Sequence, residues 1–204
     1  MDRKISGILF DVGGVLVTLD GVPSLAKLLN LEASHAAIHA RWMTSPSVVS
    51  HESGRISAAE FAAGVVTDLN LPVSPESFLQ DFCCWPSAVC PGAVELIKEI
   101  PRTYRVGILS NTSAVHWERI VAMGLADCFE FIYLSHETGC LKPAPEAFLV
   151  ALKGMGLPAA EVLFLDDGAW NVDAARSLGM HAAVVRNPQD ARAVLQEFGV
   201  LGVD

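Results

Sequence analysis

The chain has 204 residues, of which 51% are hydrophobic and 18% are charged, and its formal net charge is −9. This composition is typical of a compact globular protein and excludes a disordered chain. The excess of acidic residues argues against a nucleic acid or an anionic membrane as partner, but it is compatible with a hard cation such as Mg²⁺.

The apolar segments and the cysteines indicate the cellular compartment of the protein. The apolar run after the N-terminal MDRKISG is short and ends on an acid, so it does not resemble a signal peptide. Elsewhere, no apolar run reaches the roughly 18 residues that a membrane span needs. An odd number of cysteines without a CxxC pair favours reduced thiols over a disulfide framework. We therefore expect a soluble cytoplasmic protein with free thiols at Cys83, Cys84, Cys90, Cys128 and Cys140.

The first predicted strand spans residues 8–11 and ends on Asp11. A carboxylate at the end of a buried strand is costly unless it is paired or coordinated. Gly13 and Gly14 follow, and glycines let the backbone turn sharply and approach a ligand closely. Taken alone, this stretch is more simply explained as a strand followed by a glycine-rich turn.

Residues 22–88 carry helix signals and no convincing strand. Ser57 and Glu60 form a predicted capping box ahead of an apolar run, and Ser74 precedes a proline at a helix start. We predict a helical insert of about four helices. Its aromatic residues are expected in its own core: Trp42, Phe61, Phe78, Phe82 and Trp85.

From residue 91 onward, predicted helices and strands alternate. Strands separated by helices of this length imply crossover connections and a parallel sheet with helices on both faces. The fold class is therefore α/β, a doubly wound parallel sheet interrupted early by the helical insert. The strands are predicted at residues 104–110, 131–135, 162–165 and 181–185, and the helices at 91–100, 113–123, 144–153, 171–178 and 189–198.

Polar residues suited to one chemistry follow several of these strands. In a parallel sheet the carboxyl ends of all strands meet at one edge, where open α/β sheets bind ligands. Adjacent acids at the end of a buried strand repel each other unless a positive charge lies there. A sheet built only for stability would not need this set: Asp11, then Ser110, Asn111 and Thr112, then Ser135 and Lys142, then Asp166 and Asp167.

Each of these residues has a role available in phosphoryl transfer. Asp11 can act as a covalent nucleophile, with Asp167 as the second carboxylate of a Mg²⁺ site. Ser110 and the backbone N–H groups that open the next helix can hold phosphate oxygens, and Lys142 can neutralise charge. Asn171 either caps its helix or orients a metal-binding carboxylate. Taken one at a time, these features also have simpler interpretations: residues 110–113 could be an ordinary helix cap, and Lys142 could be a solvated loop lysine.

Four segments in this order resemble the motifs of the haloacid dehalogenase-like (HAD) hydrolases. A helical insert after the first motif is similar to the subfamily with a small helical cap, and HESGRIS resembles bacterial sugar-phosphate phosphatases of that group. The resemblance implies a Rossmann-like core of residues 1–16 and 89–204 and an all-helical cap of residues 17–88. The four segments are FDVGGVL, LSNT, LKP and FLDDGAWNVDAA.

The resemblance also implies a function and a role for each matching residue. It implies Mg²⁺-dependent hydrolysis of a small phosphorylated metabolite, such as a sugar phosphate, through an aspartyl-phosphate on Asp11. Ser110, Asn111 and Lys142 would bind the phosphate, with Lys142 also catalytic and Thr112 nearby. The metal would be held by the carboxylates of Asp11 and Asp167 and by the backbone carbonyl of Gly13. Asp166 would be a further ligand or a close neighbour of the metal, and Asn171 would support the ligands from outside the metal's coordination shell.

The sequence departs from the family at Gly13, where most HAD phosphatases carry an aspartate that protonates the leaving group. Such acid–base help is worth about 10²–10⁴-fold in rate. Either the leaving group departs without being protonated, or another side chain replaces the missing aspartate; the candidates are His51, Glu52 and Asp20. Two rival functions follow: a metal-free haloacid dehalogenase using Asp11, which the adjacent acids argue against, and a phosphometabolite-binding protein with little turnover.

Overall fold

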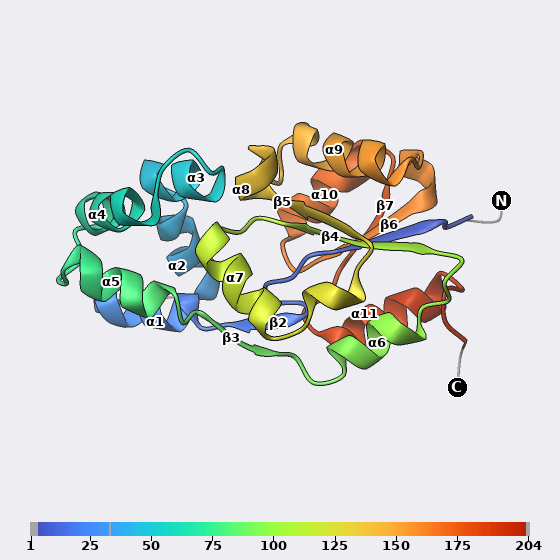
Figure 1. The fold of residues 1–204 in the computed structure, drawn as a ribbon, viewed down its shortest axis with the longest axis horizontal. Coiled ribbons are helices and arrows are strands. Elements are labelled where there is room, and N and C mark those ends of the chain that lie inside the picture. Colours follow the sequence, from blue (N-terminus) through green and yellow to red (C-terminus); the bar gives the residue numbers. More distant parts are fainter. Residues whose placement is uncertain (1–3, 33, 203–204) are drawn as a thin grey trace.

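The computed structural model describes residues 4–32 and 34–202, without the side chains of residues 35 and 36. Two parts lie side by side along the long axis of the molecule (Figure 1). A sheet with helices on both faces forms one part, and helices from the N-terminal half of the chain form the other. The chain leaves the sheet after its first strand and returns to it only after this helical insert.

The main sheet has five parallel strands in the order β5-β4-β1-β6-β7. The first strand lies at the centre, and all four of its residues are buried. Parallel strands without polar alternation are expected where both faces are covered, so the predicted α/β sheet is confirmed. The strands are β1 (Gly7–Phe10), β4 (Arg105–Ser110), β5 (Phe131–Leu134), β6 (Val162–Asp166) and β7 (His181–Val184).

Successive residues of β1 pack into two separate hydrophobic clusters. Ile8 and Phe10 belong to one cluster and Leu9 to the other, because side chains alternate between the faces of a strand. Both faces of the sheet are therefore sealed, and its strand ends are the accessible edge. One face is covered by α6 (Ala93–Glu99), α7 (Ala114–Ala122) and α11 (Pro188–Glu197), and the other by α9 (Pro145–Met155) and α10 (Ala169–Ser177).

The described residues of the helical insert form five helices, where about four were predicted. A separate helix starts at Pro46, because the residue before a proline is disfavoured in the helical region. Ser45 is accordingly extended, with φ −79° and ψ 118°, and its side chain caps the new helix. The five are α1 (Gly21–Leu29), α2 (His35–Trp42), α3 (Pro46–Glu52), α4 (Ala58–Leu69) and α5 (Pro75–Phe82).

An aromatic core of its own holds the insert together, as predicted. Phe61 and Phe82 pack with their rings tilted at 57° and their centroids 4.7 Å apart, and the ring centroids of Trp42 and Trp85 are 5.1 Å apart. These rings form a buried cluster distinct from the two clusters of the sheet. Burying an aromatic side chain stabilises a fold by about 1.5–3 kcal/mol relative to exposing it. This cluster therefore stabilises the packing of the helices of the insert against one another.

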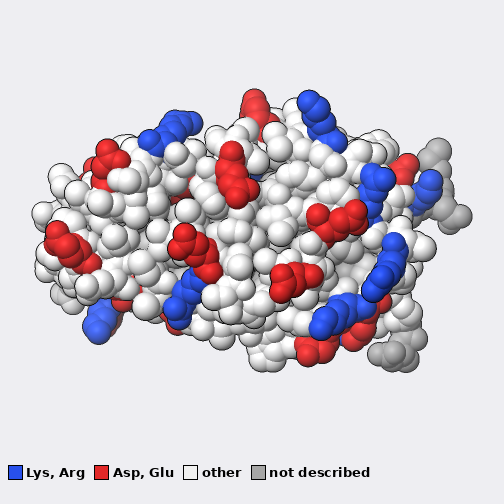
Figure 2. Space-filling view, viewed as in Figure 1, with Lys and Arg blue, Asp and Glu red and all other residues white. Residues whose placement is uncertain are grey.

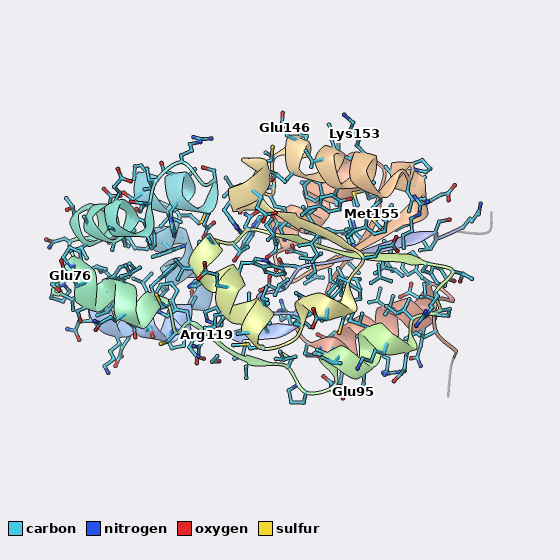
Figure 3. All side chains as sticks on the ribbon, in the orientation of Figure 1. Glu76, Glu95, Arg119, Glu146, Lys153 and Met155 are labelled. Atoms are coloured by element: carbon cyan, nitrogen blue, oxygen red, sulfur yellow. The ribbon has the colours of Figure 1, made fainter. Side chains whose placement is uncertain are left out.

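A two-stranded antiparallel ribbon joins the insert to the sheet, so the prediction of no strand within residues 22–88 is wrong at residues 86–88. The ribbon pairs β2 (Val17–Leu19) with β3 (Pro86–Val89). Arg119 on α7 donates a hydrogen bond from Nε to the Pro86 carbonyl at 2.5 Å, which fixes the ribbon on the core (Figure 3). Strands this short show no alternation, and their partners are far apart in sequence.

Three short helical turns complete the described part of the chain. They are η1 (Ala126–Cys128), α8 (Ser135–Thr138) and η2 (Ala159–Glu161). Residue 135 was predicted as the end of a strand, but it starts α8 directly after β5. Acidic and basic side chains are interspersed on the face drawn in Figure 2. Among the described residues, no helix has both the length and the apolar character to cross a bilayer.

His116 connects the insert to the core and predicts an acid-sensitive fold. Its ring stacks on Phe82 at a centroid distance of 3.9 Å, and its Nε2 lies 2.8 Å from the Phe82 carbonyl. Burial lowers the pKa of His116 to about 4. Between about pH 6.5 and pH 4, His116 is therefore protonated in the unfolded chain and neutral in the folded chain. Stability should therefore fall as pH drops from about 6.5 toward 4, by at most about 1.4 kcal/mol per pH unit from this residue.

Urea denaturation between pH 8 and pH 4 measures this effect. A His116→Gln variant should show a shallower loss of unfolding free energy below pH 6.5 than the wild type. Identical slopes in the two proteins would contradict the role given to His116.

Candidate active site

The carboxyl ends of the central strands meet beside the helical insert (Figure 1). Asp11 follows β1, and its backbone N–H donates to the Leu165 carbonyl at 2.8 Å, which continues the ladder with β6. Ser110 is the last residue of β4 and Asp166 the last of β6. The predicted convergence of these three residues at one edge is therefore present.

Lys142 connects two of the acids across this edge. Its Nζ lies 2.8 Å from Asp11 Oδ1 and 2.6 Å from Asp166 Oδ2, and its side chain is only 2% exposed. Burial alone would lower the pKa of Lys142, but Asp11 and Asp166 outweigh burial and raise it above its usual value. Lys142 is thus a buried ammonium in a double ion pair, and the interpretation as a solvated loop lysine is wrong.

Asn111 holds the backbone of Lys142 in place. Its side-chain Oδ1 accepts from the Lys142 N–H at 2.8 Å, and its Nδ2 donates to the Lys142 carbonyl at 2.9 Å. The clamp uses only one of the two Nδ2 hydrogens, so a contact with phosphate would come from the second Nδ2–H or from the backbone N–H of Asn111. Local sequence patterns do not reveal this clamp, since the two residues are 31 positions apart.

Asp166 is fixed by hydrogen bonds on both oxygens. Oδ1 accepts from the Gly168 N–H at 2.8 Å and from Asn171 Nδ2 at 3.0 Å, while Oδ2 accepts from Lys142. Asn171 therefore contacts the carboxylate of Asp166, and its role behind a metal-binding carboxylate stays a prediction. Its own Oδ1 is buried and has no hydrogen-bond partner among the described residues.

Three carboxylates come together here, from Asp11, Asp166 and Asp167. One oxygen from each lies within 4.8 Å of the others. Asp167 rests against Gly14, where an added Cβ would lie 2.6 Å from its Oδ2, so a glycine is required for this approach. Burial raises the pKa of Asp11 to about 7; Lys142 opposes this shift, and the other two acids add to it. Lys142 therefore does not fully neutralise the cluster.

The backbone after β4 forms the other side of the site. Ser110 is 5% exposed, and the Thr112 N–H donates to Ser135 Oγ at 2.9 Å. Ser113 caps α7 by accepting from the His116 N–H. The helix-cap interpretation of this stretch is thus correct for Ser113, while Ser110 lies beside Asp11 at the strand ends.

The three candidates for the missing acid lie in different surroundings. Asp20 is exposed and precedes α1. His51 is buried in the insert, where its ring stacks on Phe61 with centroids 4.2 Å apart. Glu52 is partly buried, and the charges of Lys142 and Asp11 act on it.

The sequence of residues 5–179 matches the model of the haloacid dehalogenase-like hydrolase family. The protein is a HAD-like hydrolase. It is 28% identical to a D-ribitol-5-phosphate phosphatase of Bacteroides thetaiotaomicron, over 94% of this chain and 97% of that relative. It is also 26% identical to an N-acetylmuramic acid 6-phosphate phosphatase of Pseudomonas aeruginosa, over 92% of this chain and 86% of the relative.

Solved structures of other HAD enzymes share the fold. One from Bacteroides thetaiotaomicron, in complex with magnesium and inorganic phosphate, superposes with a TM-score of 0.70 at 26% identity, covering 88% of this chain and 93% of that one. An L-2-haloacid dehalogenase from Xanthobacter autotrophicus gives a TM-score of 0.64 at 23% identity over 89% and 77% of the chains. The second likeness concerns the fold alone.

Proposed function

We propose that this HAD-like hydrolase is a Mg²⁺-dependent phosphatase that acts on a small phosphorylated metabolite through a phosphoryl group carried by Asp11. The observation that carries the proposal is the cluster itself: three carboxylates within 4.8 Å, two of them bonded to a buried lysine, at the ligand-binding edge of the sheet. The named phosphatases among the relatives support the same reaction.

The residues at this edge fit a magnesium ion. Mg²⁺ prefers oxygen ligands, usually one or two carboxylates with water and phosphate. Asp11, Asp167 and the Gly13 carbonyl would hold it, while the hydrogen bonds on Asp166 make that residue a support for Lys142 and the cluster. The unpartnered buried Oδ1 of Asn171 and the glycine that lets Asp167 approach both agree with an ion and its water in this place.

The chain's own residues account for the chemical steps. A carboxylate oxygen of Asp11 attacks phosphorus, the bond to the leaving oxygen breaks, and water then removes the phosphoryl group from Asp11. Lys142 lowers the repulsion between Asp11 and the incoming phosphate, and Ser110 with the start of α7 holds phosphate oxygens. When bound, Mg²⁺ would neutralise negative charge shared by the carboxylates and the phosphate.

The helical insert would control which metabolite is accepted. We propose that residues 1–16 and 89–204 form the catalytic core and residues 17–88 a cap over it. The ribbon of β2 and β3 joins the two parts at these boundaries. Sugar and sugar-alcohol phosphates are the substrate class that the relatives suggest. The five cysteines form no disulfide bond, which supports a location in a reducing compartment such as the cytoplasm.

A phosphate-release screen tests the proposal. The panel should contain sugar 1-phosphates, sugar 6-phosphates and sugar-alcohol phosphates, each with Mg²⁺ and with EDTA, beside 2-haloacids assayed for halide in EDTA. We expect phosphate release that requires Mg²⁺ and no halide release. Halide release in EDTA would instead support a dehalogenase. Phosphate binding without release from any compound would support a binding protein.

A further inference from the structure

Apart from the nucleophile Asp11, the loop after β1 offers no acid near Gly13 to protonate the leaving group. Gly13 has no side chain, and a Cβ added there would overlap the Cδ1 atom of Leu19. The space that an acidic side chain at position 13 would enter is therefore covered by an apolar group from β2. An acid for this reaction has to come from another element.

The end of α3 approaches the site from the insert. Glu52 is the last residue of this helix, and Gly54 follows in a turn with φ +71°. An added Cβ at Gly54 would overlap the carbonyl oxygen of His136, so the turn lies tightly on α8. Because α8 directly follows β5 at the strand ends, this contact holds Glu52 beside the catalytic edge.

Groups from both parts of the protein surround the Glu52 carboxyl. The Trp42 indole forms a hydrogen bond with it from within the insert, and the charges of Lys142 and Asp11 act on it from the core. Three other acids of the insert are engaged elsewhere: Glu60 bonds to Ser57, Asp68 to Ser45 and Ser47, and Asp81 to Trp85.

We infer that Glu52 is the general acid of this enzyme, replacing the aspartate that Gly13 lacks. The inference rests on the proposed phosphatase function. The two other candidates fit less well. His51 places Nδ1 3.3 Å from the Ile56 carbonyl and stacks on Phe61 inside the insert, and Asp20 is exposed.

The protonation state of Glu52 suits this role. Burial raises its pKa to about 7; the Trp42 hydrogen bond and Lys142 lower it somewhat, and Asp11 raises it further. A carboxyl that titrates near neutral pH is protonated often enough to donate, and its conjugate base can take the proton back. Two elements packed against α3 carry titratable groups: His136 on α8, whose Nδ1 lies 3.1 Å from the Thr112 carbonyl, and Glu60 on α4, which is held in its capping box.

The proton transfers balance over one turnover. As Asp11 attacks phosphorus and the ester P–O bond breaks, the leaving oxygen takes the Glu52 proton and departs as an alcohol. The Glu52 carboxylate then takes a proton from the water that attacks the aspartyl-phosphate. This restores protonated Glu52 and free Asp11, and releases inorganic phosphate.

A pair of substrates with different leaving groups tests this role. Phenolate needs protonation far more than 4-nitrophenolate does, because phenol is the weaker acid. Glu52→Gln should lower kcat/KM for phenyl phosphate by about 10²–10⁴-fold and for 4-nitrophenyl phosphate by less than about 10-fold. The matched control is Glu76→Gln, an exposed acid at the far end of α5 (Figure 3), which should leave both values unchanged.

Two further readouts separate a proton donor from a structural residue. The kcat/KM of the wild type should fall above about pH 7, where Glu52 loses its proton, and this limb should be absent in Glu52→Gln. Gly13→Asp placed in the Glu52→Gln background should restore part of the phenyl phosphate activity. Leu19 must turn away for this, which its 44% exposure permits.

The outcomes distinguish this inference from the function on which it rests. An active wild type with equal losses on the two esters, or with no loss in Glu52→Gln, would overturn the role of Glu52 alone. A wild type that releases no phosphate from any ester would overturn the phosphatase and the general acid together.

Discussion

Replacing Asp11 by asparagine is expected to abolish phosphate release, with a loss of about 10⁴-fold or more in kcat, while the chain still folds. An amide nitrogen and oxygen cannot displace the leaving group as a carboxylate does. The fold should survive because the charged form of Asp11 is itself unfavourable there: burial raises its pKa to about 7. Lys142 would keep its 2.6 Å contact with Asp166.

The Asp11 variant is best compared with Asp20→Asn. Asp20 belongs to the same N-terminal segment but is exposed, so its variant should keep wild-type turnover. Circular dichroism and urea denaturation would establish that both variants fold. Retained turnover in a folded Asp11→Asn protein would remove the covalent mechanism.

Replacing Lys142 by methionine should both inactivate and destabilise the protein. Breaking a buried ion pair by removing one partner costs about 3–5 kcal/mol, because the remaining charge stays buried without compensation. Here the loss would leave Asp11 and Asp166 facing each other, with Asp166 fully buried. The penalty should be largest near pH 8 and shrink toward pH 5, because burial raises the pKa of Asp11 to about 7 and its carboxylate takes up a proton in this range.

Urea denaturation at pH 8 and pH 5 measures this penalty. Lys153→Met is the matched control, since Lys153 is exposed near the end of α9 (Figure 3) and its loss should cost little. A Lys142→Met protein as stable as the Lys153 variant at pH 8 would show that the ion pair does not hold the acids together.

Much of the fold and of the catalytic edge could be predicted from residue patterns. Three strands of the main sheet are largely apolar runs, which signal strands with two covered faces: Asp11 directly follows β1, Ser110 ends β4 and Asp166 ends β6. Once the sheet is parallel, the meeting of these residues follows from topology. The roles given to them remain predictions for the experiments above.

Other features depend on contacts between distant segments, which local patterns do not encode. The β2–β3 ribbon pairs Val17 with Val89, and each strand alone is too short to show a periodicity. The clamp of Asn111 on Lys142 and the cover of Leu19 over Gly13 likewise arise only on folding. The extra helix of the insert, in contrast, could have been predicted from the sequence, because Pro46 marks the start of a new helix.

A crystal grown with Mn²⁺ tests the central claim most directly, because Mn²⁺ takes the same oxygen ligands as Mg²⁺ and its anomalous signal locates the ion. We expect a single strong peak between the Asp11 and Asp167 carboxylates and within reach of the Gly13 carbonyl. A peak at another place, or none there in a protein whose turnover needs the metal, would contradict the proposed site.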